Sequence, residues 1–310
     1  MIRPVRIRSG IGPFVLALMA VILALGAARA EGIRLDTLKI PVPNAGGAGP
    51  AAALLDAIVL RPDDGQPHPL VLLNHGSPRS ASDRLSMSPY GMWAQAAEFA
   101  RRGWVAVAFL RRGYGASQGG WAETYGPCSG PDYAKAGRAG ASDIAAAAKF
   151  MAGQAYVSSG KWISVGRSAG GFATVALTSS APSGLAAAIV FAPGRGSSGP
   201  DTVCGEGELV DAFAQFGKSS RIPLLWVSAD NDHFFGPKLV ARLSDAFAKS
   251  GGKLSLVRAA AFGGDGHMLF SENGAAIWAP IVDRFLAANH LVLRDRLLDA
   301  PERPAQLRTR

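Results

Sequence analysis

The chain has 310 residues, of which 48% are hydrophobic and 18% charged, with 38 glycines, 20 prolines and only 2 cysteines. This composition excludes an intrinsically disordered chain, a disulfide-rich scaffold and a collagen-like repeat. A formal net charge of +9 would favour a nucleic acid or an anionic membrane as partner only if the basic residues formed a continuous surface track.

The first thirty residues have the pattern of a secretory signal peptide. Arg3, Arg6 and Arg8 precede an uncharged apolar run over residues 11–26, and Ala28-Arg29-Ala30 offers small residues for a cut before Glu31. The run is shorter than the roughly 20 residues of a spanning helix. An uncleaved anchor is the alternative. With no arginine pair and no cysteine at these places, the pattern favours Sec-type export without a lipid anchor. We expect a periplasmic or secreted protein without stable membrane insertion after cleavage.

The charge left after cleavage is smaller and scattered. The segment 1–30 contains four arginines and no acidic residue, so its removal lowers the formal charge to about +5. The remaining basic residues form no stripe interleaved with aromatic residues, and we therefore predict no nucleic-acid partner. Residues 31–292 are long enough for one large domain, and residues 293–310 are expected to form a polar C-terminal tail.

Within this domain, apolar strand-like segments alternate with helical patterns. The predicted strands are 69–74, 104–110, 162–166, 185–191, 223–228 and 253–258, and the predicted helices are 92–102, 140–153, 169–180, 237–250 and 275–290. This alternation, with nearly continuous apolar strands, predicts an α/β fold whose doubly wound, mostly parallel sheet has helices on both faces. Ligands bind such sheets at the carboxyl ends of the strands.

Two pentapeptides match G-x-S-x-G, and their context separates them. Ser168 in Gly166–Gly170 directly follows a predicted strand and precedes a predicted helix, which is the arrangement of a nucleophile elbow. Ser117 in Gly115–Gly119 lies in a segment too rich in glycine to begin a helix. Ser168 is therefore the predicted nucleophile, and Ser117 is predicted to belong to a structural turn.

A serine nucleophile needs a histidine base and an acid that orients it. Of the histidines after Ser168, His267 closes a flexible loop behind a predicted strand, whereas His290 ends a helical pattern and His233 adjoins an acid. We therefore predict His267 as the base.

The acid is expected in the turn after the strand 223–228, which offers Asp230 and Asp232. Asp232 lies deeper in this turn and is the preferred candidate. The other aspartate is then expected to stabilise the turn or cap the following helix.

The oxyanion of the intermediate needs two backbone donors. One is the N–H of Ala169, which follows the nucleophile, and the other is the N–H of Ser77 in the loop after the strand 69–74, because Pro78 has none. His75 in the same loop is interpreted as a buried structural histidine.

These motifs together carry a family resemblance. They are His75-Gly76, Arg112-Gly113-Tyr114-Gly115-x-Ser117, the elbow at Ser168, Asp232 and Gly266-His267. In this order, over about residues 50–290, they resemble the α/β-hydrolase superfamily, in particular its dienelactone hydrolase-like and exported serine esterase and peptidase branches. The resemblance implies attack by the serine on a carbonyl, an acyl-enzyme intermediate and hydrolysis by water, with neither cofactor nor metal. Dienelactone hydrolases proper carry a cysteine nucleophile and are cytoplasmic, so their lactone substrate is not implied here.

Two loops after strands are expected to form a small lid over the site. Cys128 and Cys204 lie in these loops, and in an oxidising compartment they are expected to form a disulfide, with two free thiols as the alternative. Arg111, Tyr125 and Arg195 are candidates for a substrate pocket, where a guanidinium would pair with a substrate carboxylate. The alternative is that they are surface residues.

The sequence therefore predicts an exported serine hydrolase that acts on small carboxylic esters. A serine peptidase acting on short peptides and a non-catalytic binding domain of the same fold are the alternatives. No pattern in the chain indicates an oligomeric state.

Overall fold

The computed structural model of the protein describes residues 32–43, 52–294 and 297–299. The predicted signal peptide and most of the predicted tail lie outside these residues. Of the tail, Leu298 is buried, and its backbone exchanges hydrogen bonds with Arg101 at 3.0 Å. In the ranges that are described, no helix is long and apolar enough to cross a bilayer.

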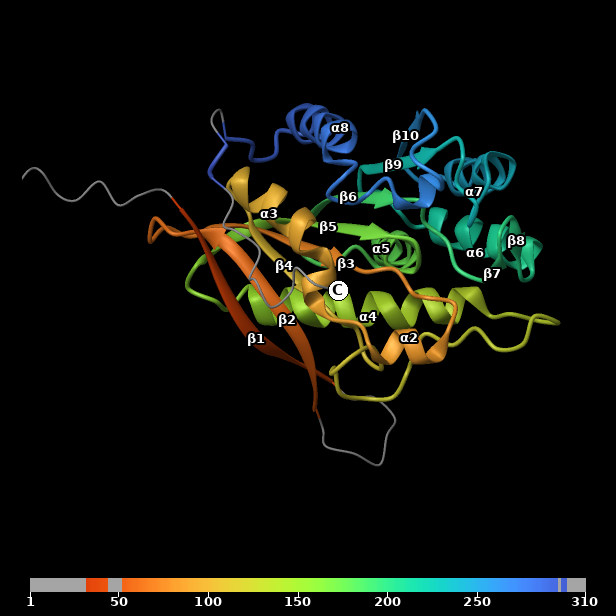
Figure 1. Ribbon diagram of the computed structural model, residues 1–310, viewed down its shortest axis with the longest axis horizontal. Helices are drawn as coiled ribbons and strands as arrows, with labels where there is room; N and C mark the ends of the chain where they lie inside the picture. Colours follow the sequence, from red (N-terminus) through yellow and green to blue (C-terminus); the bar gives the residue numbers. More distant parts are fainter. Residues whose placement is uncertain (1–31, 44–51, 295–296, 300–310) are drawn as a thin grey trace, which may run out of the picture. The chain divides into compact units, whose positions relative to one another are not determined.

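Eight strands form one sheet, in the order β1-β2-β4-β3-β5-β6-β9-β10 (Figure 1). The strands are β1 (Ile33–Pro43), β2 (Ala52–Pro62), β3 (His68–Asn74), β4 (Val105–Phe109), β5 (Val157–Arg167), β6 (Leu185–Phe191), β9 (Leu224–Ala229) and β10 (Leu254–Ala259). All pairs from β4 to β10 are parallel, whereas β2 is antiparallel to both β1 and β4. The predicted mostly parallel α/β sheet is confirmed.

Two strands that the sequence did not predict form one edge of the sheet. Pro41 and Pro43 lie in β1, which pairs only with β2 among the described strands. Proline lacks a backbone donor and is tolerated at an edge, but it weakens the strand signal in the sequence. The helix α6 (Glu206–Gly217) and the small ribbon of β7 (Ser197–Gly199) and β8 (Thr202–Val203) were also not predicted.

Helices cover both faces of the sheet (Figure 1). Alternate residues of β3 show the division: Leu70 and Leu72 belong to the core under α4 (Tyr133–Met151), α5 (Ala169–Ser180), α6 and α7 (Pro237–Lys249). Val71 and Leu73 belong to the core under α3 (Trp93–Arg101) and α8 (Ala275–Ala288). Burial on both faces explains why the central strands β4 and β6 are apolar throughout.

The loops that follow the parallel strands gather at the carboxyl edge of the sheet. The predicted disulfide is present there, because Cys128 in the loop between β4 and α4 is bonded to Cys204 just before α6, with 5.1 Å between their Cα atoms. It joins two loops that are far apart in the sequence. The helix α4 begins at Tyr133 rather than at the predicted Gly140, since the Asp132 side chain caps it by accepting the N–H of Lys135.

Candidate active site

Ser168 occupies a sharp turn between β5 and α5. Its backbone has φ 54° and ψ −123°, a conformation that costs a residue with a side chain about 1–3 kcal/mol. Hydrogen bonds on both sides hold it there: the Ser168 N–H donates to the carbonyl of Phe191 at 3.0 Å, and the Ser168 carbonyl accepts the N–H of Phe172 at 2.8 Å. The structure therefore forms the elbow that the sequence predicted at this serine.

The glycines on either side of Ser168 are required by close packing. A Cβ atom on Gly166 would lie 2.3 Å from the carbonyl oxygen of Gly170, and one on Gly170 would lie 2.2 Å from that of Asn74. No side chain fits at either position. The loop after β3 also passes close to the serine, because a Cβ on Gly76 would lie 3.2 Å from the Ser168 Cβ.

His267 is paired with Asp232 and not with Asp230. The His267 Nδ1 lies 3.2 and 3.1 Å from the two carboxylate oxygens of Asp232, and both side chains are buried. Asp230 is instead exposed and forms an ion pair with Arg258 at 2.6 Å. Since Nδ1 is engaged by the carboxylate, Nε2 is the ring nitrogen left to exchange a proton with a reacting group.

The turn after β9 fixes both members of this pair. The Asp232 Oδ1 accepts the backbone N–H groups of Phe234 at 2.7 Å and Phe235 at 2.9 Å. The Phe234 ring stacks on the imidazole of His267, with 3.9 Å between the ring centroids. His233, the alternative base, is exposed and lies 3.1 Å from Asp201. Backbone hydrogen bonds and ring stacking thus hold the His267–Asp232 pair in place.

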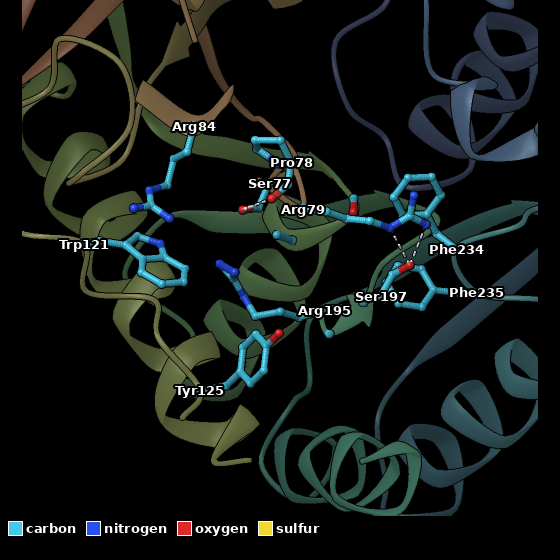
Figure 2. Close-up of a pocket in the computed structure, with 14 residues that line it drawn as sticks. Ser77, Pro78, Arg79, Arg84, Trp121, Tyr125, Arg195, Ser197, Phe234 and Phe235 are labelled. Atoms are coloured by element: carbon cyan, nitrogen blue, oxygen red, sulfur yellow. Dashed lines mark hydrogen bonds between the residues drawn. The ribbon is translucent and has the colours of Figure 1, made fainter. Parts of the chain in front are cut away.

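Ser168 lies where two pockets meet. The His267 pocket has a volume of about 430 Å³ and is lined by Ser168, His267, Ser77, Arg167, Phe234 and Met268, among others. The Arg195 pocket, shown in Figure 2, has a volume of about 90 Å³ and is lined by Ser168, Ala169, Arg84, Trp121, Tyr125 and Arg195, among others. Ser77 and Phe234 line both pockets. A substrate carbonyl at Ser168 would therefore have room on two sides.

The two predicted oxyanion donors border this junction. Ala169 is the first residue of α5, so its N–H has no acceptor within the helix, and it lines the Arg195 pocket. Ser77 follows β3 and lines both pockets. Among residues 32–43, 52–294 and 297–299, no group of three His, Cys, Asp or Glu side chains is placed to hold a metal ion.

His75 braces the loop between β3 and Ser77. Its Nδ1 donates to the Gly76 carbonyl at 2.7 Å, and its Nε2 accepts the backbone N–H of Arg111 at 3.1 Å. Burial, followed by the charge of Arg111, holds the pKa of His75 well below its ordinary value. The ring is therefore neutral, as befits the structural role predicted for it.

The lowered pKa of His75 predicts a pH dependence of stability. Below about pH 6.5, His75 binds a proton in the unfolded chain but stays neutral in the folded protein. The free energy of unfolding therefore falls as the pH falls, by at most about 1.4 kcal/mol per pH unit. His75→Gln should make this fall shallower. Urea unfolding at pH 7.5 and pH 5.5 measures it, and equal slopes for both proteins would contradict the prediction.

Arg111 lines neither of the two pockets at Ser168, which corrects the expectation from the sequence. Its side chain is completely buried, pairs with Glu123 and donates to the His75 carbonyl at 3.0 Å. Arg195 pairs with the same carboxylate. Although burial raises the pKa of Glu123, the charges of Arg111 and Arg195 hold it well below its usual range. The Arg111 side chain points into the interior, where it pairs with the buried carboxylate of Glu123.

Removal of the Glu123 charge should destabilise the fold. Glu123→Gln leaves two guanidinium groups buried without a carboxylate, and loss of one partner from a buried pair costs about 3–5 kcal/mol. Glu206→Gln is the matched control, because Glu206 pairs with Arg242 at the surface and such pairs contribute about 0–1 kcal/mol. Urea unfolding at pH 7.5 compares them. A loss below 1 kcal/mol in Glu123→Gln would contradict the assigned pairing.

The other predicted pocket residues, Tyr125 and Arg195, do line the smaller pocket (Figure 2). Arg84, which no motif in the sequence singled out, also lines this pocket and lies on the short helix α2 (Ala81–Leu85). A weak signal for α2 exists, since Ser80 caps it by accepting the N–H of Asp83 at 3.3 Å. No pattern in the sequence shows that this helix lies beside the site.

Ser117, the serine of the second pentapeptide, is structural. Its hydroxyl donates to the Leu110 carbonyl at 2.6 Å and accepts the N–H of Asp56 at 2.9 Å. These bonds join the end of β4 to β2. Ser117 lines neither of the two pockets at Ser168.

The sheet order and the serine elbow define an α/β-hydrolase fold. The sequence profile of the X-Pro dipeptidyl-peptidase (S15) family matches residues 51–236, and the chain belongs to this family. Together with the esterase structures that share its fold, this makes the protein a serine hydrolase. The matched segment includes Ser168 and Asp232 and ends before His267. No curated protein sequence matches the chain.

Solved structures with the same fold include several esterases. The Pyrococcus furiosus esterase Pf2001 has 15% sequence identity and a TM-score of 0.57, covering 93% of this chain and 97% of its own. Esterase 2 of Thermogutta terrifontis, phosphorylated by paraoxon, has 17% identity and a TM-score of 0.57, covering 85% and 96%. A Klebsiella pneumoniae protein assigned as a dienelactone hydrolase has 15% identity and a TM-score of 0.54, covering 84% and 99%. At these identities the likeness establishes the fold.

Proposed function

We propose that the protein hydrolyses small carboxylic esters, with Ser168 as nucleophile, His267 as general base and Asp232 as the acid that orients it. The observation that carries this proposal is that the Asp232-bound His267 and Ser168 line one pocket. Each residue also lies on its own loop at the carboxyl ends of β5, β9 and β10. This is where ligands bind to sheets of this kind.

The proposed reaction begins when Nε2 of His267 takes the proton of the Ser168 hydroxyl. The Ser168 oxygen attacks the ester carbonyl, and the resulting oxyanion accepts the N–H groups of Ala169 and Ser77. The imidazolium, stabilised by Asp232, then gives its proton to the leaving alcohol. A water molecule, activated by the same nitrogen, hydrolyses the acyl-enzyme and releases the acid.

The route of the proton indicates which pocket holds the alcohol and which holds the acyl group. Because His267 protonates the leaving oxygen, the alcohol lies on the side of the His267 pocket, which is the larger one. The acyl group then extends into the Arg195 pocket, beside Ala169. Its volume of about 90 Å³, against about 430 Å³ for the His267 pocket, favours a short acyl chain.

The runner-up function is cleavage of short peptides, as the family description suggests. An X-Pro dipeptidyl group has a cationic amino terminus and would place it in the acyl pocket. That pocket is lined by Arg79, Arg84 and Arg195 and by no acidic residue. Like charges repel, so its lining favours esters over peptides with a free amino terminus.

A substrate panel tests the choice between esters and peptides. p-Nitrophenyl esters of increasing acyl length should be hydrolysed, with the highest kcat/KM among the shortest chains and little turnover of Ala-Pro-p-nitroanilide. Turnover of the anilide with no turnover of the esters would overturn the proposal in favour of the peptidase.

We also propose that the protein is exported to the periplasm or secreted. The Cys128–Cys204 disulfide supports this, because such bonds persist in oxidising compartments. Amino-terminal sequencing of the protein from the extracytoplasmic fraction should begin at Glu31. Cytoplasmic protein that retains residues 1–30 would overturn the proposal.

A further inference from the structure

The Arg195 pocket has an excess of positive charge. Arg79, Arg84 and Arg195 line it, and none of its lining residues is acidic. Arg79 donates through Nη2 to the Ser197 hydroxyl at 2.8 Å and to the Gly199 carbonyl at 3.1 Å and lies over the Phe234 ring, so only its Nη1 lacks a partner among the described residues. Arg84 and Arg195 are therefore the groups to consider.

Arg195 is buried but retains free donors. Only its Nη2 donates to described side chains, namely to Glu123 and to the Tyr114 hydroxyl at 3.1 Å. A guanidinium has five N–H donors, so those on Nε and Nη1 remain. Among the described residues, Asn74 Oδ1 is the one fully buried side-chain N or O atom without a hydrogen-bond partner. The Nε and Nη1 atoms of Arg195 also have no such partner, so they are not fully buried. Figure 2 shows the guanidinium pointing into the space between Trp121, Ser77 and Tyr125.

The charge of Arg195 is not fully balanced within the protein. Glu123 serves both Arg111 and Arg195, and all three side chains are almost completely buried. The nearby Arg112 is paired with Asp143 at 2.7 Å, and His75 is neutral. The buried cluster of Arg111, Arg195 and Glu123 therefore carries one net positive charge. Uncompensated charge in a buried place is costly unless an anion joins it.

Arg84 supplies a second guanidinium to the same space. Its Nε donates to the Gly113 carbonyl at 3.2 Å, and its guanidinium carbon lies 4.1 Å from the centroid of the Trp121 ring. Its Nη1 and Nη2 donate to no described residue. Figure 2 shows Arg84 and Arg195 pointing into the pocket from different sides, with the Trp121 ring beside both. Paired guanidinium groups with free donors suit a carboxylate.

We infer that the preferred substrates are monoesters of short dicarboxylic acids. In the bound substrate Ser168 attacks the ester carbonyl, while the free carboxylate at the far end of the acyl chain accepts hydrogen bonds from Arg195 and Arg84. The volume of about 90 Å³ has room for a carboxylate and a short spacer. Hydrolysis leaves this carboxylate unchanged and adds one water across the ester bond. This inference rests on the proposed esterase function.

The test compares two ethyl esters of nearly equal shape, monoethyl succinate and the uncharged ethyl 4-oxopentanoate. A pH-stat at pH 7.5 measures the acid released. The wild type should have a kcat/KM about 10- to 100-fold higher for the succinate ester, because hydrogen bonds to a charged group are stronger. Arg84→Gln and Arg195→Gln should each reduce this ratio about tenfold or more.

Two controls accompany these variants. Arg242→Gln removes an exposed arginine that pairs with Glu206 and should retain the wild-type ratio. Labelling of each variant with a fluorophosphonate reports whether Ser168 remains reactive and the fold intact. Arg84→Gln keeps the test valid if Arg195→Gln fails to fold, since Arg84 is only half-buried and contributes to no buried ion pair among the described residues.

The possible outcomes separate the two proposals. Equal hydrolysis of both esters by the wild type overturns the inference about the carboxylate and leaves the esterase function standing. If the preference for the succinate ester is unchanged in Arg84→Gln, and also in Arg195→Gln where that variant folds, these arginines do not bind the carboxylate. Hydrolysis of neither ester, nor of the p-nitrophenyl esters, overturns the proposed function itself.

Discussion

Ser168→Ala is expected to lower kcat for ester hydrolysis by a factor on the order of 10⁶. The variant retains the elbow backbone and the His267–Asp232 pair but has no oxygen to form the acyl-enzyme. A fluorophosphonate probe should label the wild type and leave Ser168→Ala unlabelled. The esterase 2 of Thermogutta terrifontis, which is phosphorylated by paraoxon, shows that a protein of this fold reacts with an organophosphate.

The control for this variant is Ser117→Ala, the serine of the other G-x-S-x-G sequence. Ser117 lies in the turn after β4 and lines neither pocket at Ser168, so its replacement should retain labelling. Labelling that persists in Ser168→Ala would show that another residue is the nucleophile. No labelling of the folded wild type would favour a non-catalytic binding domain.

Asp232→Asn is expected to lower kcat by a factor on the order of 10⁴. The carboxylate lies where it can accept the N–H of the His267 Nδ1, which leaves Nε2 for the proposed role as base. An amide in its place would favour the opposite tautomer, in which Nε2 carries the proton and cannot accept the one from Ser168. The kinetics of p-nitrophenyl acetate hydrolysis at pH 7.5 measure this loss.

Asp230→Asn provides a matched control, two residues away in the same turn. Asp230 is exposed and pairs with Arg258, so its replacement should change kcat by less than about threefold. A loss in Asp230→Asn that equals the loss in Asp232→Asn would point to general damage to the turn after β9. In that case the assignment of Asp232 as the orienting acid would be wrong.

Much of the fold could be predicted from the sequence because the signals for strands and turns are local. Apolar runs predicted β3, β4, β6, β9 and β10 within one residue of their bounds. The strand β5 begins at Val157, five residues before the predicted start, because its first part is polar. The edge strand β1 was not predicted, since Pro41 and Pro43 weaken its pattern. Its partner β2 was not predicted either, and the structure identifies it as a strand through its pairing with β1. The helix α6, which lies between Cys204 and β9 in the sequence, was not predicted.

The candidate site divides in a similar way. The elbow at Ser168 is a property of five consecutive residues, whose glycines are required by contacts with one another and with the end of β3. The predictions of His267 and Asp232 used chain order, because loops after parallel strands meet at one edge of the sheet. The structure then brought Asp232 to His267 and turned Asp230 to the surface, where it meets Arg258.

The arginines could not be sorted without the tertiary structure. Arg111 and Arg195 both lie in loops after strands, and nothing in their neighbours along the chain distinguishes them. Their difference depends on the position of Glu123, which draws Arg111 fully inward while part of Arg195 still faces the pocket. Arg84 lies on a five-residue helix whose place over the site is set by contacts such as that with Gly113.

The fold class and the residues of the proposed triad could thus be predicted from the sequence by itself. Buried strands and the serine elbow are patterns of consecutive residues, and the order of the loops follows from the order of the strands. Only the tertiary structure decided the charge of the Arg195 pocket. A strand or a turn can be recognised from residues that are neighbours along the chain. The electrostatic field in a pocket depends instead on which charges, far apart in the sequence, share one carboxylate.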